Sequence, residues 1–156
     1  MKALALKINN LIQPLRTLSD SVASPFFDLG VRFYMAHIFF SSGMLKFENF
    51  LNDDWESTTF LFEEIHPIPG VNSDLSAVAG TAGELILPIL LALGLFGRLG
   101  AAGLLIMTAT IQFAIPAEYG MQNPDHYFWM FLLGMILLKG SGNISVDHVI
   151  QKWLNK

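Results

Sequence analysis

Long apolar stretches, separated by short polar segments, dominate the pattern along this chain of 156 residues. Residues 99–117 contain no charged side chain, and residues 75–96 contain a single one, Glu84. The hydrocarbon core of a bilayer is about 30 Å thick and needs roughly 20 helical residues to cross it. Both stretches are therefore predicted to be transmembrane helices.

Two further stretches are long enough but less uniformly apolar. Residues 26–47 include four ionisable side chains, namely Asp28, Arg32, His37 and Lys46, and residues 121–138 end in the run YFWMFLLGMILL. Turn signals flank them, since Asn123-Pro124 favours a helix start and Gly140 a helix end. We predict four transmembrane helices, at 26–47, 75–96, 99–117 and 121–138. A buried helix of a soluble protein is the alternative for the fourth.

Apolar residues at helical spacing also mark both ends of the chain. At the N-terminus they are Leu4, Ile8, Leu11, Leu15 and Leu18; after a cap at Ser145 they are Val146, Val149, Ile150, Trp153 and Leu154. The expected fold is all-α, an integral membrane four-helix bundle with amphipathic interfacial helices at both termini. Residues 1–24 form the first interfacial segment, 25–140 the transmembrane domain with an outer loop at 48–74, and 141–156 the tail.

Composition and charge exclude several classes of function. Hydrophobic residues make up 53% of the chain and charged residues 14%, against about 25% in soluble domains. The net charge is −4 and the chain has no cysteine. We therefore expect no nucleic-acid binding, because there is no basic patch, and no thiolate catalysis or iron–sulfur cluster.

Basic residues fall on one side of the predicted spans. Seven lie in the termini, in the loop between the second and third spans and at the end of the fourth: Lys2, Lys7, Arg16, Arg98, Lys139, Lys152 and Lys156. The opposite side has Lys46 and an acidic loop. The positive-inside rule then predicts a multi-pass membrane protein with both termini cytoplasmic.

Ionisable groups within the spans should face the bundle and find partners. At about 100° per residue, Asp28, Arg32 and Lys46 share one face of the first span, and the four-residue spacing of Asp28 and Arg32 suits an ion pair. Glu84 faces inward on the second span. Two interpretations stay open for these groups: an Arg32–Glu84 or Lys46–Glu84 ion pair that fixes helix register, or a ligand site.

The third span adds Thr108 and Gln112 to the expected intramembrane polar pocket of Arg32, Lys46 and Glu84. The histidines, His37, His66, His126 and His148, do not cluster, and the methionines are spread over three helices. We therefore expect no metal site and neither haem nor copper. His66 in the acidic loop suggests at most a weakly held cation. No nucleophile–base motif identifies a catalytic residue.

Three motifs resemble the DoxX family of small bacterial membrane proteins. They are Arg32 followed by FSSGMLKF, the stretch GELILPILLALGLFGRLGA with Glu84 and Arg98, and KGSGNISVDH near the C-terminus. Many relatives have Gly-Pro-Gly where this chain has Gly140-Ser141-Gly142. The resemblance implies a four-helix bundle in a bacterial inner membrane and puts functional polar residues at Arg32, Lys46 and Glu84.

The resemblance also implies a subunit or accessory of a quinone-linked membrane redox system, with a quinone as ligand and a membrane redox subunit as partner. Arg32 and Lys46 would stabilise negative charge on a quinone oxygen, and Glu84 would pair with them or relay a proton. The alternatives are a non-enzymatic scaffold or maturation factor for copper-binding modified peptides, and a small-molecule transporter. With four helices, a transporter requires a homo-oligomer.

Overall fold

A computed structural model describes residues 1–65, 67–68 and 70–156, with only the backbone of residues 3–5. His66, and with it the expectation of a weak cation site, lies outside the described residues, as does the side chain of Leu4. Within these ranges the ordered elements are all helical, with no strand. The all-α prediction is confirmed.

The first 51 residues form one long helix rather than two separate segments. Helix α1 (Lys2–Leu18) passes through a π-helical turn, η1 (Ser19–Ala23), into α2 (Ser24–Leu51) without a break. The helix therefore continues through the expected segment boundary at residue 24. A proline ring clashes with the carbonyl four residues earlier, and the wide η1 turn lies where Pro25 would meet the carbonyl of Ser21.

The remaining helices follow α2 along the chain. They are α3 (Trp55–Phe60), η2 (Leu61–Ile65), α4 (Ser73–Leu93), α5 (Gly97–Ala109), η3 (Thr110–Ala114), η4 (Ala117–Tyr119), α6 (Pro124–Lys139) and α7 (Val146–Leu154). Asn123 caps α6 by accepting from the amide of Asp125, and Ser145 caps α7 by accepting from the amide of His148. These predicted boundaries are confirmed, as is the end of α6 before Gly140.

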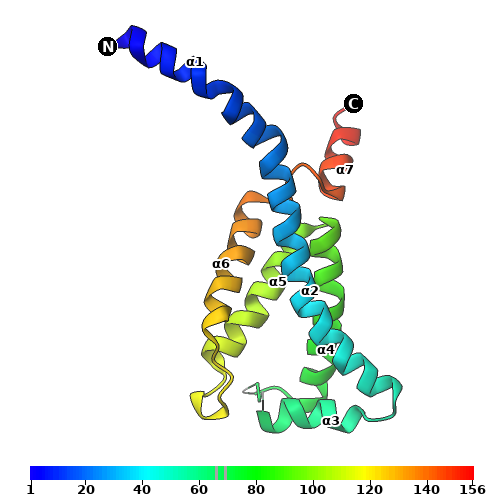
Figure 1. The fold of residues 1–156 in the computed structure, drawn as a ribbon. Helices are drawn as coiled ribbons and strands as arrows, with labels where there is room; N and C mark the ends of the chain where they lie inside the picture. The colour runs from blue at the N-terminus through cyan, green and yellow to red at the C-terminus, as the bar shows by residue number, and fades with distance from the viewer. Residues whose placement is uncertain (66, 69) are drawn as a thin grey trace.

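Helices α2, α4, α5 and α6 pack side by side, with α2 against α4, α4 against α5 and α5 against α6 (Figure 1). Both termini lie at one end of this group, and α3 lies across the opposite end (Figure 1). The core between the helices is apolar and consists of Met35, Phe39, Leu91, Ala101, Leu104, Leu132, Leu133 and Ile136.

Large apolar side chains also cover the outside of these helices. Among the most exposed are Phe33, Ile86, Leu99, Phe113 and Phe131. Two described stretches are long and apolar enough to cross a membrane, Ser73–Leu93 with a mean hydropathy of 1.8 and Gly97–Ala114 with 1.2. The other two expected spans correspond to α2, which contains ionic side chains, and α6, which has only 16 residues.

The C-terminal segment is attached to the turn between α4 and α5. Asp147 accepts hydrogen bonds from the amides of Phe96 and Gly97, at 2.9 and 3.1 Å, where α5 begins. Its own amide donates to the carbonyl of Gly94, which ends α4 in the left-handed conformation at φ 64°. A carboxylate at a helix N-terminus satisfies free amides and opposes the positive end of the helix dipole.

Replacing Asp147 with Ala should therefore destabilise the fold by about 2 kcal/mol, the scale of two charge-assisted hydrogen bonds. Thermal unfolding of the detergent-solubilised protein would measure the loss as a lower Tm. Asp20→Ala is the matched control, because Asp20 is exposed and has no hydrogen-bond partner within the described part of the chain. Equal Tm values for the two variants would contradict this role of Asp147.

Candidate functional site

A cavity of about 630 Å³ lies between α2, α4, α5 and α6 and is bordered by η2. Most of its lining is apolar, including the rings of Phe39, Phe62 and Trp129. The polar side chains on its wall are Ser42, Lys46, Ser76, Glu84, Thr110 and His126. A largely apolar cavity with a few converging polar groups is the usual form of a small-molecule site.

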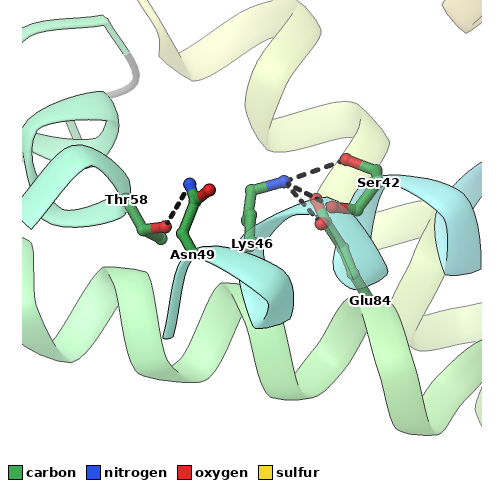
Figure 2. A network of polar contacts seen from close by, with 5 residues as sticks. All are labelled: Ser42, Lys46, Asn49, Thr58 and Glu84. Carbon is green, nitrogen blue, oxygen red and sulfur yellow. Dashed lines mark hydrogen bonds and ion pairs between the residues drawn. The ribbon is translucent and has the colours of Figure 1, made fainter. Parts of the chain in front are cut away.

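The strongest polar contact in the wall is the ion pair between Lys46 on α2 and Glu84 on α4. Lys46 Nζ lies 2.6 Å from Glu84 Oε2, and each side chain is only 10% exposed. The ammonium group also donates to Ser42 Oγ at 2.9 Å and to the Ser42 carbonyl at 3.5 Å (Figure 2). All three Lys46 protons are thus used within the protein.

Close approach of the two helices makes this pair possible. At Gly43 a Cβ atom would lie 2.9 Å from the backbone carbon of Glu84, so only glycine fits there. Gly43 is one turn before Lys46 on the same face of α2. The missing side chain therefore lets α4 approach until Glu84 meets Lys46.

Helix α3 and η2 cover the end of the cavity that faces away from the termini. Asn49 Nδ2 on α2 donates to Thr58 Oγ1 on α3 at 3.2 Å, and Thr58 is 1% exposed (Figure 2). The ring of Phe62 in η2 lies 2.6 Å from where a Cβ of Gly80 would be. The described part of the segment 48–74 thus packs on α2 and α4 through these contacts.

On the opposite wall, His126 of α6 is fixed by Gln112 of η3. Gln112 Oε1 lies 2.8 Å from His126 Nδ1 and accepts from the amide of Asn123 at 3.2 Å. Both side chains are buried, at 7% and 8% exposed. His126 also packs on Trp129, with ring centroids 5.1 Å apart. Gln112 positions His126 from behind and is not itself part of the cavity wall.

Ser76 on α4 is the unsatisfied polar group of the wall. It is 3% exposed, and its hydroxyl has no hydrogen-bond partner among the described residues. An unpaired buried hydroxyl costs on the order of 1–3 kcal/mol, and this cost is recovered when a ligand or a water supplies a partner. Because Ser76 borders the cavity, the missing partner would lie inside it.

Arg32 lies elsewhere, which corrects the predicted grouping of Arg32 with Lys46 and Glu84. Its guanidinium donates to the α4 carbonyls of Leu91, at 3.4 Å, and Ala92, at 2.9 Å, and to the carbonyl of Ile144. It is 1% exposed and does not border the cavity. The carbonyls of Leu91 and Ala92 lie at the C-terminal, negative end of the α4 dipole, so Arg32 compensates the charge of that helix end.

The Asp28–Arg32 ion pair expected from the four-residue spacing is also not formed. Asp28 instead pairs with Lys139 at the end of α6, at 2.7 Å. Because Arg32 points toward the carbonyls at the end of α4, Asp28 pairs with the more exposed Lys139 instead. Thr108 on α5 is buried, but its hydroxyl donates to the carbonyl of Leu104 within its own helix and does not reach the cavity.

Of the five residues predicted for the pocket, Lys46 and Glu84 border the cavity, and Gln112 lies behind it. The sequence analysis missed Ser42, Ser76 and His126. His126 follows the Asn123 cap and lies within the predicted span at 121–138, but it was considered only as a metal ligand. Among the described residues no three potential ligands gather to hold a metal ion.

Gly43→Ala should force α2 and α4 apart and weaken the Lys46–Glu84 pair. Gly30→Ala on the same helix is the matched control, because a Cβ there meets nothing within 4 Å. We expect Gly43→Ala to lower the unfolding free energy by about 1–3 kcal/mol, the usual cost of overpacking. Gly30→Ala should leave it unchanged or raise it by up to about 1 kcal/mol. Chemical unfolding in detergent would compare them, and equal stabilities would contradict the close approach.

An all-helical chain with apolar outward faces and its buried ion pair turned inward is a membrane protein in character. Residues 27–117, more than half of the chain, match the DoxX family model, and the chain belongs to the DoxX family, whose members are membrane-associated. It is 28% identical over 132 residues to an uncharacterized protein of Haemophilus influenzae, covering 78% of this chain and 82% of that one. No solved structure matches.

Proposed function

We propose that the protein is an integral, multi-pass protein of a bacterial inner membrane in which α2, α4, α5 with η3, and α6 form a transmembrane four-helix bundle. The apolar outward faces support this, since lipid tolerates them and water does not. Arg98 and Lys139 lie at the same end as the termini, and the positive-inside rule favours a cytoplasmic position for that end.

The domain division follows from the same arrangement. Residues 25–140 hold the transmembrane helices, and residues 48–74 cover their outer end. The exposed apolar residues of the two ends, such as Leu11 and Leu15 in α1 and Trp153 and Leu154 in α7, favour contact with the cytoplasmic membrane surface for 1–24 and 141–156.

The cavity would bind the head of a quinone, and the protein would serve as a subunit or accessory of a quinone-linked redox system. One observation carries this proposal: the Lys46–Glu84 pair borders an otherwise apolar cavity in which the Ser76 hydroxyl is unpaired. Apolar walls suit a ring and its hydrocarbon tail, and a few polar groups orient the ring oxygens. Arg32 has no part in this site, because it binds the end of α4 and does not border the cavity.

Titration of the purified protein with a decyl-substituted benzoquinone and its hydroquinone tests this function. Wild type should bind at least one form saturably and quench the fluorescence of Trp129, which borders the cavity. The double variant Lys46→Gln/Glu84→Gln removes both charges together, so neither is left buried and unpaired. It should raise Kd about tenfold, equivalent to about 1.4 kcal/mol.

Asp28→Asn/Lys139→Gln is the matched control, since it neutralises a lysine–carboxylate pair outside the cavity. Its Kd should equal that of wild type. Circular dichroism would establish that both double variants retain their helices. Absence of saturable binding by wild type, or the same Kd for all three proteins, would overturn the proposed function.

A further inference from the structure

The protonation of the His126 ring follows from its neighbours. The backbone amide of Asn123 can only donate, so the Gln112 atom that receives it is the oxygen. The same oxygen lies 2.8 Å from His126 Nδ1, and an oxygen acceptor requires a proton on that nitrogen. In the neutral ring, Nε2 then carries a lone pair. Nε2 has no hydrogen-bond partner in the described part of the chain.

Glu84 presents a second acceptor. Its Oε2 is bound to Lys46, whereas Oε1 has no partner within residues 1–65, 67–68 and 70–156. The Lys46 ammonium cannot serve a ligand, because its three protons go to Glu84 and Ser42. The hydroxyls of Ser42 and Ser76 can either donate or accept. Glu84 Oε1 and His126 Nε2 are therefore two fixed acceptors of the wall, and the Thr110 hydroxyl, whose proton goes to the Ile106 carbonyl, can also only accept.

We propose that the cavity selects a neutral aromatic head that donates hydrogen bonds, such as a hydroquinone, over the acceptor-only quinone, and that His126 is a specificity-determining residue. This inference rests on the proposed function and assigns the form of the ligand. A hydroquinone offers two hydroxyl donors to the two fixed acceptors. A quinone offers two carbonyl acceptors, which would leave Glu84 and His126 without donors after the loss of water.

Equilibrium dialysis with three probes tests the selection: a decyl-substituted hydroquinone, the corresponding benzoquinone, and the dimethyl ether of the hydroquinone. The ether resembles the hydroquinone in ring and tail but has no donor. We expect the hydroquinone to bind about tenfold more tightly than either of the others, the factor for one ordinary hydrogen bond.

The outcomes separate this inference from the proposed function. If the benzoquinone or the ether binds as tightly as the hydroquinone, the selection is wrong while the quinone site stands. If none of the three binds saturably, the proposed function is wrong and the inference falls with it. Binding of the hydroquinone alone, or with a clear preference, supports both.

His126→Phe keeps an aromatic ring against Trp129 but removes the acceptor. It should reduce the preference for the hydroquinone over the ether severalfold. His37→Phe is the matched control, because His37 is exposed on α2 and does not border the cavity; it should keep the wild-type ratio. The same ratio in His126→Phe as in wild type would overturn the role of His126.

Nitrogen-15 NMR measures which nitrogen of the His126 ring carries the proton. A purely structural role of His126 does not require one particular tautomer. In wild type the His126 ring should show the Nδ1–H tautomer, and Gln112→Leu should shift it toward the usual mixture. A wild-type ring with its proton on Nε2 would contradict the argument, since that nitrogen would then donate. A shift of the tautomer together with a smaller hydroquinone preference in Gln112→Leu would support it.

Discussion

Two cations on the same helix, Arg32 and Lys46, are buried, and each needs a group that compensates its charge. Arg32 and Lys46 lie 14 residues apart on α2, about 21 Å at 1.5 Å per residue. Burial of an unpaired charge costs far more than a domain can lose. The two are compensated differently: Lys46 by the carboxylate of Glu84, and Arg32 by backbone carbonyls at the end of α4. This difference gives the two ends of the molecule different properties.

At the Arg32 end most polar groups pair with one another, although Arg32 Nε is buried without a hydrogen-bond partner in the described part of the chain. The guanidinium draws the end of α4 and the carbonyl of Ile144 together, and Asp147 binds the amides that begin α5. The C-terminal motif therefore fixes the α4–α5 turn. At the Lys46 end a carboxylate oxygen, an imidazole nitrogen and a serine hydroxyl without partners in the described part of the chain surround a cavity. The cavity and these groups lie together, which makes this end the one proposed to bind a ligand.

The sequence predicted features that depend on near neighbours along the chain. Apolar runs located the helices, and cap residues such as Asn123 and Ser145 located two of their starts. The inward turn of Glu84 followed from the cost of a charge in hydrocarbon. Lys46–Glu84 was one of two ion pairs that the spacing allowed, and periodicity alone could not choose between them.

Hydrogen-bond and ion-pair partners that lie far apart in the sequence could not be predicted from neighbouring residues. The partner of Arg32 is a set of carbonyls, which have no side-chain signature, and one of them is 112 residues away. The i,i+4 rule describes side chains that stay on the surface of one helix. Arg32 leaves that surface, so Asp28 turns to Lys139 on another helix. His126 was missed because its role depends on Gln112 and on the packing of α6 against α5.

The charge balance of the cavity limits what can occupy it. Lys46 and Glu84 sum to zero, and the neutral His126 ring on which the proposed selection rests adds no charge. A charged ligand would bring an uncompensated charge into an apolar wall, whereas a neutral ligand does not disturb the pair. Hydrogen bonding to Glu84 Oε1 leaves Oε2 on Lys46, so a ligand can bind without breaking the contact between α2 and α4. The ion pair can therefore hold the helices together and present a binding group at the same time.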